Sequence, residues 1–301
     1  MSDVIQLRNV TWRAGREFAI RDLAMSVPSG CVYGFLGPNG SGKTSTIRLM
    51  LGMLRAEHGT ISVLGHDVPK GVHHALARIG YVPERLHLYT SLTVEETMRY
   101  HAAFYADWDA KRAEELRRAF ALRAETGVER LSKGESGKLM MLLALAHNPE
   151  LLILDEPTDG LDPVVRRDVL AALLEYVNSK KATVLISSHL IHEQERICDH
   201  VGVMDDGRMV AEMAMTTFRS GIKRLRVLDA PTEIGALPFT LLNRDQSIGR
   251  EEQWVVRGWQ PEMQQWFASG TSELREVIDL DLEESFVELL RSARTPDVEA
   301  N

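Results

Sequence analysis

Residues 31–44 have the sequence Cys31-Val32-Tyr33-Gly34-Phe35-Leu36-Gly37-Pro38-Asn39-Gly40-Ser41-Gly42-Lys43-Thr44, and this segment decides the fold of the 301-residue chain. Its first six positions form an apolar run that predicts a buried strand. From about residue 44 to 55 the apolar side chains recur at helical spacing, which predicts a helix with one buried face. The segment is therefore a strand, a glycine-rich turn and a helix, which is a building unit of α/β folds.

Residues 37–44 fit the pattern G-x-x-x-x-G-K-[ST] of a phosphate-binding loop. Its glycines let backbone N–H groups curl around phosphates, and the N-terminus of the following helix adds partial positive charge. Lys43 would reach the β- and γ-phosphates, and Thr44 would offer its hydroxyl to Mg²⁺. A chance glycine-rich turn is the alternative, and the position between a strand and a helix argues against it. The residues predicted here to bind nucleotide are Gly37, Pro38, Asn39, Gly40, Ser41, Gly42, Lys43, Thr44 and Ser45.

A second apolar strand, at residues 151–154, ends in two carboxylates, Asp155 and Glu156. Ligand crevices in open α/β sheets form at this end of the strands. Asp155 suits the coordination shell of Mg²⁺, and Glu156 suits activation of an attacking water. A solvated acidic pair would be the better interpretation if the phosphate loop were absent.

Composition narrows the possible partners. The formal net charge is -8 and no run of Lys and Arg is long enough to follow a phosphate backbone, so we expect no nucleic-acid partner. No stretch reaches about 18 consecutive apolar residues, and Met1 is not followed by a basic and apolar leader, so we expect a cytoplasmic protein. The two cysteines, Cys31 and Cys198, stand in apolar or helical patterns, which predicts buried reduced thiols.

The pattern along the chain predicts two domains. Residues 1–216 alternate strands and helices around a charged helical subdomain at about 88–148, with strands at 182–186 and 201–204 closing the sheet. Residues 217–301 carry short alternating runs at 224–228, 239–242 and 254–256 and a helix at 282–290, which predicts a small C-terminal α+β domain. We expect its tryptophans to form its core rather than a ligand cage, and these are Trp254, Trp259 and Trp266.

The stretch Leu131-Ser132-Lys133-Gly134-Glu135 resembles the signature of ATP-binding-cassette (ABC) ATPases. Other landmarks of that family stand in the expected order: Tyr81-Val82-Pro83-Glu84 at the Q-loop position, Asp159-Gly160-Leu161-Asp162 at the D-loop, and Ser187-Ser188-His189 after a strand. The resemblance covers about residues 4–213. It implies an α/β P-loop NTPase fold of the ABC ATPase type, with the helical segment as its inserted subdomain.

The resemblance also implies roles for individual residues. Ser132 and Gly134, with Glu135 beside them, would bind the γ-phosphate of a nucleotide held by the opposite subunit. Asp162 of the D-loop is also expected to bind nucleotide. A serine and a glycine at the start of a helical run are an anion site of the helix-terminus kind, which agrees with that role. His189 would contact the γ-phosphate held by its own subunit. The implied assembly is a head-to-tail dimer, either a homodimer or a heterodimer with a second ABC ATPase.

The resulting assignment also names catalytic residues and metal ligands. The catalytic residues are Glu156, His189 and Lys43, and the ligands of Mg²⁺ are Thr44, Glu84 and Asp155. ATP and Mg²⁺ are the expected cofactors.

Three positions depart from the commonest family pattern. Glu84 stands where glutamine is usual, which keeps an oxygen ligand but adds negative charge near the metal. Lys133 and Glu135 replace residues of the LSGGQ form. The aromatic that would stack on adenine is displaced, because ungapped comparison places Ala14 there, and we predict that Trp12 rather than the nearby Phe18 takes this role.

The resulting functional prediction is a Mg-dependent ATPase that drives a separate integral membrane permease from the cytoplasmic face of the cell membrane. Residues 279–286 resemble the strand-to-helix ending of exporter-type subunits in prokaryotes, which favours export. A permease-independent ABC ATPase is the alternative, but the chain lacks the second cassette, coiled-coil insertion or zinc module usual in that class. A permease-linked regulatory device is a third possibility that the sequence does not separate from transport.

Overall fold

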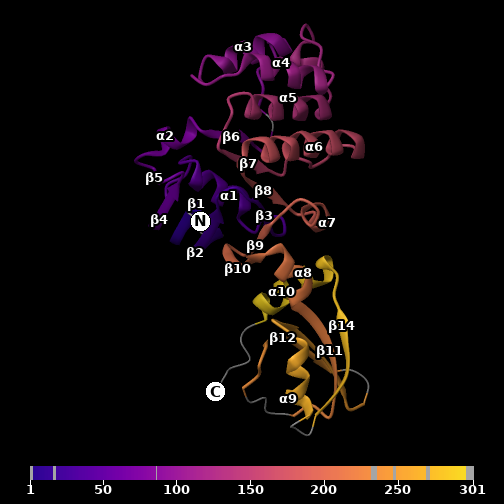
Figure 1. Cartoon of the computed structure of the whole chain (residues 1–301). Coiled ribbons are helices and arrows are strands. Elements are labelled where there is room, and N and C mark those ends of the chain that lie inside the picture. Colours follow the sequence, from indigo (N-terminus) through magenta and orange to yellow (C-terminus); the bar gives the residue numbers. More distant parts are fainter. Residues whose placement is uncertain are drawn as a thin grey trace.

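The computed structural model describes residues 3–15, 18–85, 87–231, 236–246, 249–268 and 272–295. Its elements stack in layers along one long axis (Figure 1). Helices α3, α4 and α5 lie at one end, two sheets lie in the middle, and a third sheet lies at the other end. Within the described ranges, no helix is long and apolar enough to cross a membrane.

The central sheet has six strands in the order β10-β9-β3-β8-β7-β6. Their bounds are β3 Val32–Leu36, β6 Ile79–Val82, β7 Leu151–Asp155, β8 Thr183–Ser188, β9 His200–Asp205 and β10 Arg208–Ala214. The pairs of β6, β7, β8, β3 and β9 are all parallel, so these strands end at the same edge of the sheet. The prediction that residues 201–204 close the sheet was wrong, because the antiparallel strand β10 lies outside β9.

Helix α1, Lys43–Met50, follows β3 directly and is shorter than predicted. Its C-cap is Leu51, and Gly52 follows with a φ of +68°, a conformation that ends a helix. Leu54 therefore lies beyond the helix, although it still packs against the same core as α1.

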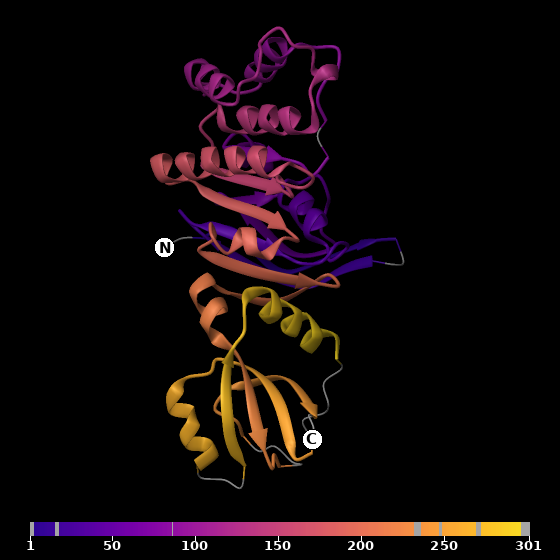
Figure 2. The same cartoon turned by 90° about the vertical axis from the view of Figure 1, so that its right-hand side faces the viewer.

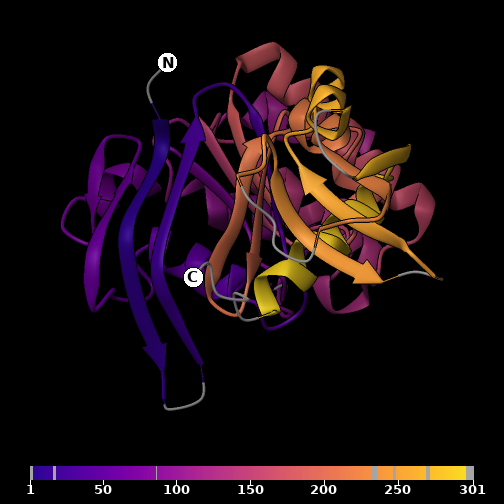
Figure 3. The ribbon, with the colours of Figure 1, turned by 90° about the horizontal axis from the view of Figure 1, so that it is seen from below.

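A separate antiparallel sheet with the strand order β2-β1-β4-β5 covers the outer side of α1. Its strands are β1 Asp3–Ala14, β2 Phe18–Pro28, β4 His58–Val63 and β5 His66–Val68, and the short helix α2 Val72–Leu76 follows them. Seen from below, the paired ends of β1 and β2 extend outward from the rest of the molecule (Figure 3). In that pairing Trp12 lies opposite Ile20, and Ala14 lies opposite Phe18.

Helices form the layer on the other side of the central sheet. They are α3 Val94–Ala102, α4 Ala110–Ala119, the 3₁₀ turn η1 Val128–Arg130, α5 Lys133–Leu145, α6 Pro163–Lys180 and α7 Ile191–Gln194. Most residues of α5 from Leu139 to Leu145 are buried, which is why this stretch is apolar on all sides rather than on one face.

The third sheet is antiparallel, in the order β12-β13-β11-β14. It follows helix α8, Met215–Gly221, in which the predicted division at residue 216 falls. The bounds are β11 Ile222–Leu228, β12 Thr240–Gln246, β13 Glu251–Arg257, β14 Glu273–Asp279, η2 Pro261–Met263, α9 Gln264–Ala268 and α10 Leu282–Arg294. Three of these strands and α10 overlap the predicted elements, whereas β14 and α9 had no counterpart in the sequence analysis.

The two faces of this sheet pack against different partners. One face holds a small aromatic core in which Trp254 and Trp259 are buried and Trp266 packs at its margin, so the prediction for these residues is confirmed. The other face is covered by α10, which lies between this sheet and strands β9 and β10 (Figure 2). Phe286 and Leu289 of α10 belong to the same buried cluster as Val203 of β9. Hydrophobic packing is thus continuous from the central sheet into the C-terminal part.

Candidate active site

The phosphate loop connects β3 to α1 with two glycines in left-handed conformations. Gly40 has a φ of +82°, and Gly42, the N-cap of α1, has a φ of +112°. A Cβ atom at Gly42 would lie 2.9 Å from Phe18 and 2.9 Å from Met204, so glycine is required there for space as well as for conformation. No side chain caps this helix terminus, which leaves its N–H groups available to an anion.

Lys43, the first residue of α1, points into the site and is 6% exposed. Its ammonium donates hydrogen bonds to the carbonyl oxygens of Gly37, at 2.7 Å, and Pro38, at 3.4 Å. It also lies 3.3 Å from Oε1 of Glu156. The phosphate loop and the end of β7 are therefore joined through this one cation.

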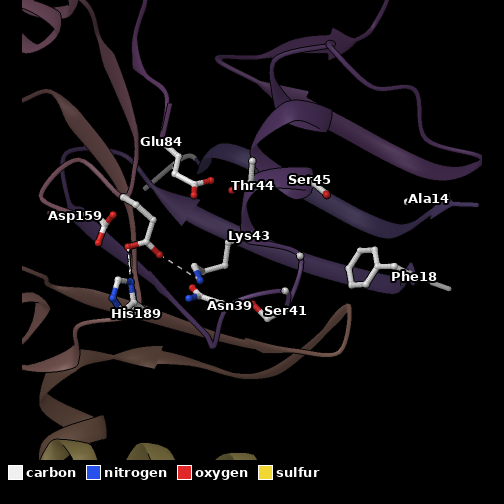
Figure 4. Close-up of a pocket in the computed structure, with 13 residues that line it drawn as sticks. Ala14, Phe18, Asn39, Ser41, Lys43, Thr44, Ser45, Glu84, Asp159 and His189 are labelled. Carbon is white, nitrogen blue, oxygen red and sulfur yellow. Dashed lines mark hydrogen bonds and ion pairs between the residues drawn. The ribbon is translucent and has the colours of Figure 1, made fainter. Parts of the chain in front are cut away.

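Glu156 stands just beyond β7, with a φ of +49° that turns its side chain into the site. Its backbone N–H donates to Oγ of Ser187 at 3.0 Å. Its Oε2 lies 2.9 Å from Nδ1 of His189 and accepts a 3.3 Å hydrogen bond from the His189 backbone N–H. Dashed lines in Figure 4 mark the contacts of this carboxylate, and they end at Lys43 and at His189. A base held between a cation and an imidazole is well placed for proton transfer.

Asp155, the last residue of β7, is fully buried. Its Oδ1 accepts a 2.7 Å hydrogen bond from Oγ of Ser187, whereas its Oδ2 has no hydrogen-bond partner in the described part of the chain. Burial raises the pKa of this carboxyl, the nearby Glu84 and Glu156 carboxylates add to the shift, and hydrogen bonds from Ser187 and Thr44 oppose it. An unpaired buried carboxylate oxygen, with the Thr44 hydroxyl and the Glu84 carboxylate nearby, is the all-oxygen donor set that suits Mg²⁺.

These groups open into a pocket of about 580 Å³. Ten of the predicted residues line it: Asn39, Gly40, Ser41, Gly42, Lys43, Thr44, Ser45, Glu84, Glu156 and His189. Sequence analysis did not assign the other three lining residues, Ala14, Phe18 and Asp159, to the site. Figure 4 shows Phe18 and Ala14 on one side of Lys43 and Asp159 and His189 on the other, so the pocket runs between the antiparallel sheet and the end of β7.

Trp12 does not line this pocket, so its predicted role in stacking on adenine stays a prediction without support from the pocket geometry. It sits opposite Ile20 in the β1 and β2 pairing and packs against the buried core behind the hairpin. Phe18, opposite Ala14 at the outer end of the same pairing, provides the aromatic ring at the pocket. Both residue pairs belong to the pairing of β1 with β2. The pair Ala14 and Phe18, nearer the hairpin end, is the one that reaches the pocket.

The signature residues Ser132, Gly134 and Glu135 lie away from the pocket of their own chain. Ser132 is the N-cap of α5, where its Oγ accepts a 3.2 Å hydrogen bond from the Glu135 backbone N–H. The Glu135 carboxylate in turn accepts from the backbone N–H of Ser132 at 2.9 Å and from its hydroxyl at 2.8 Å. These hydrogen bonds lower the pKa of Glu135.

Asp162 also lies outside the pocket of its own chain, so its predicted contact with nucleotide stays a prediction. It is the N-cap of α6, and its Oδ1 accepts hydrogen bonds from the backbone N–H groups of Val164, at 3.0 Å, and Val165, at 3.1 Å. Asp159, three residues earlier, lines the pocket instead, and its carboxylate lies 3.7 Å from the ammonium of Lys133 in the signature.

Both cysteines are free and buried, as predicted. Burial raises the pKa of Cys31 to about 11 and that of Cys198 further. Neither thiol lines the pocket.

Comparison with known proteins gives this arrangement a family. Residues 20–159 match the family model described as ABC transporter. The chain is 37% identical over 216 residues to the Nod factor export ATP-binding protein I of Burkholderia lata, covering 70% of each chain. It is 35% identical over 215 residues to the bacitracin transport ATP-binding protein BcrA of Bacillus licheniformis, covering 71% of this chain and 70% of that one. A solved structure of an ATP-binding subunit of an ABC transporter matches with a TM-score of 0.67 at 30% identity, over 72% of this chain and 92% of that chain. The chain belongs to the ABC transporter family, as an ATP-binding subunit whose ATPase activity is coupled to transport.

Proposed function

We propose that the pocket between the phosphate loop and the end of β7 is the hydrolytic site, and that Lys43, Glu156 and His189 carry its chemistry. The observation that supports this most directly is the contact of one carboxylate, Glu156, with both Lys43 at 3.3 Å and His189 at 2.9 Å. These residues come from α1, the end of β7 and the loop after β8, so the fold rather than local sequence brings them together.

The contacts suggest an order of events. The phosphates of ATP compete with Glu156 for the ammonium of Lys43, because both are anions and Lys43 carries the charge between them. Once Lys43 contacts phosphate, the Glu156 carboxylate is released to accept a proton from the attacking water. His189 contacts Oε2 of Glu156 and so keeps the carboxylate oriented after the ammonium of Lys43 has moved to the phosphates.

Thr44, Asp155 and Glu84 would hold Mg²⁺ in this site. The metal would supply neutralisation of phosphate charge. Ser187 has a separate role, because its hydroxyl contacts both Asp155 and the backbone N–H of Glu156 and so fixes the metal ligand and the base relative to each other.

The signature supports a composite site in a head-to-tail dimer. Ser132 and Gly134 stand at the N-terminus of α5, away from the pocket of the same chain, so they are available to the nucleotide of an opposing subunit. The opposing subunit is a second copy of this chain or another ABC ATPase.

We further propose that this dimer works on a membrane permease in the export direction. The support comes from the relatives, which are named for Nod factor export and bacitracin transport. The site lies at one edge of the central sheet, and the helices α3 to α5 form one end of the molecule, where a partner can bind without blocking the pocket (Figure 1). We expect the assembly at the cytoplasmic face of the membrane.

Glu156→Gln tests the chemical assignment. The amide keeps the shape of the side chain but is not a base, so turnover falls about 100-fold or more while ATP binding persists. Steady-state phosphate release and calorimetric titration with ATP measure the two properties. Glu150→Gln is the matched control, because Glu150 precedes β7 as Glu156 follows it and is paired with Arg78 at the surface. Hydrolysis by Glu156→Gln at the rate of Glu150→Gln would exclude Glu156 as the base.

A further inference from the structure

The turn between β9 and β10 supports the phosphate loop from behind. The backbone N–H of Gly207 in this turn donates a 2.9 Å hydrogen bond to the carbonyl oxygen of Ser41 in the loop. Met204, at the end of β9, fills the space behind Gly42 and contacts Oγ1 of Thr46 at 3.7 Å. The position of the loop is therefore tied to the position of this turn.

The same turn is tied to the strand that carries Phe18. The carbonyl oxygen of Gly207 accepts a 3.0 Å hydrogen bond from the backbone N–H of Arg21 in β2. The guanidinium of Arg21 also pairs with Asp206 at 3.2 Å. One turn thus contacts both walls of the pocket, the phosphate loop and the β2 wall.

A residue from the far end of the chain pairs with this turn. Arg294, in the last turn of α10, donates to Oδ2 of Asp205 at 2.6 Å and to Oδ1 at 2.9 Å. The two residues are 89 positions apart in sequence. The carboxylate of Asp205 is only 8% exposed, so Arg294 compensates a charge that solvent hardly reaches.

We propose that Arg294 is a positioning residue for nucleotide binding, which acts through Asp205 on the turn that holds the phosphate loop. Asp205 is the last residue of β9 and directly precedes the turn residues Asp206 and Gly207, which hold the phosphate loop and β2. Pairing with Arg294 neutralises this carboxylate and keeps it turned away along α10. Without the guanidinium, a poorly solvated anion remains at the end of β9 and seeks donors in the adjoining turn, which displaces the phosphate loop that this turn holds. The C-terminal part thereby sets the affinity of the nucleotide pocket. This inference rests on the proposed nucleotide site.

The test compares two arginines of α10 in the full-length protein. Arg294→Ala raises the Kd for ADP with Mg²⁺ about threefold to tenfold, measured by calorimetry. ADP is chosen because it occupies the phosphate loop without requiring the opposing signature. Arg291→Ala is the matched control, because Arg291 makes a similar two-point pair with Asp245, but within the C-terminal part. This control changes the Kd less than about twofold.

Three further measurements separate positioning from general destabilisation. In Arg294→Ala the KM for ATP rises by the same factor as the ADP Kd, while kcat stays within about twofold, because the loop still closes once nucleotide is bound. Arg294→Lys keeps the cation and restores most of the affinity, and Arg294→Gln, which removes the charge but keeps a long polar side chain, is the test variant if Arg294→Ala does not fold. In an Asp205→Asn background, Arg294→Ala has no further effect on the Kd, because the charge that Arg294 compensates is gone.

Equal Kd values for Arg294→Ala and Arg291→Ala would overturn the proposal. So would an unchanged effect of Arg294→Ala in the Asp205→Asn background, which would mean that Arg294 does not act through Asp205. A wild-type protein that does not bind ADP would instead contradict the nucleotide site itself, so failure of the two proposals can be told apart.

Discussion

Helices α1 and α5 both begin with a lysine, but their N-termini are completed in opposite ways. At α1 the N-cap is Gly42, no side chain caps the helix, and Lys43 is 6% exposed and turned into the pocket. At α5 the N-cap is Ser132, a reciprocal box with Glu135 satisfies the terminus, and Lys133 is 60% exposed.

The difference shows what each terminus needs in order to be stable. The terminus of α5 is satisfied by its own side chains, so it can stand at the surface of one subunit and meet an anion only when another subunit arrives. The terminus of α1 has no such side chains, and its remaining hydrogen-bonding capacity is directed at the pocket. The N-terminus of α5 thus suits a nucleotide held by a partner subunit. The N-terminus of α1 suits a nucleotide held by its own subunit.

The largest expected effect separates the two lysines. Lys43→Ala weakens ATP binding at least about 100-fold, because it removes the buried cation that faces the phosphates. Lys133→Ala leaves the affinity nearly unchanged, since Lys133 is 60% exposed and contacts Asp159 rather than the phosphate loop. Calorimetric titration of both variants with ATP measures the difference. Equal losses would remove the distinction between the two helix ends.

The next effect tests whether the end of α5 serves an opposing subunit. Ser132→Asp keeps a good N-cap, so the free energy of unfolding changes by only about 0.5 kcal/mol, but it adds a negative charge where phosphate would bind. Homodimers of this variant, and of Lys43→Ala, should trap no ATP. Mixed dimers of the two should trap ATP at one site, where an intact loop faces an intact signature.

Retention of labelled ATP on a sizing column measures the trapping. Mixed dimers that demonstrably form but retain no more ATP than either parent would contradict the head-to-tail arrangement. Ser132→Ala is the complementary control, because it removes the N-cap without adding charge. It costs about 1 kcal/mol of stability.

A smaller effect concerns the aromatic wall beside the end of α1. Phe18 lies against Gly42 and lines the pocket, so Phe18→Ala raises the Kd for ATP about threefold to tenfold through lost stacking on the base. Trp12→Phe, two pairs further from the hairpin end, leaves the Kd unchanged. Titration with a fluorescent adenine nucleotide compares them, and a larger effect at Trp12 would return the adenine site to its sequence-predicted place.

The smallest effect is a pH dependence of stability that arises from the capping box at the N-terminus of α5. Because the pKa of Glu135 in the folded protein is lowered, its ionised form stabilises the fold above its unfolded pKa, near 4.3, and this contribution is lost as the pH falls through the folded value. Denaturant unfolding of the wild type and Glu135→Gln should differ by about 0.3 kcal/mol at pH 7, given the exposure of this side chain. The difference should shrink as the pH falls below the unfolded pKa toward the lowered folded one. A difference that grew on acidification would have the wrong sign for this capping role.

Much of the site could be predicted because parallel strands bring their carboxyl ends together. The loop after β3, the pair Asp155 and Glu156 after β7, and His189 after β8 follow three neighbouring strands, so each motif implied the position of the others. Spacing within one motif was enough to place Lys43 and Thr44.

The sequence was least decisive where two similar residues compete for one role. Asp159 and Asp162 lie in the same turn, and the pattern did not separate them, although an aspartate just before Pro163 is a signal for a helix N-cap. Trp12 and Phe18 are separated by strand register, which a single sequence does not display. The pairing of Asp205 with Arg294 depends on how α10 docks against the central sheet, and no local pattern reports it.

The shared core between α10 and the central sheet bears on how this chain can be recombined with its relatives. Phe286 and Leu289 of α10 are buried in one cluster with Val203 of β9 and Met215 of α8. A chain cut after residue 216 would expose that apolar surface to solvent. A chimera joined there would pack an α10 from one protein against a central sheet from another, whose side chains are not complementary to it. Exchange of the C-terminal part between transporters therefore requires that the facing residues of β9, β10 and α8 travel with it. In this protein the segment that can be exchanged as a unit is therefore larger than the C-terminal domain, residues 217–301, that the sequence pattern predicts.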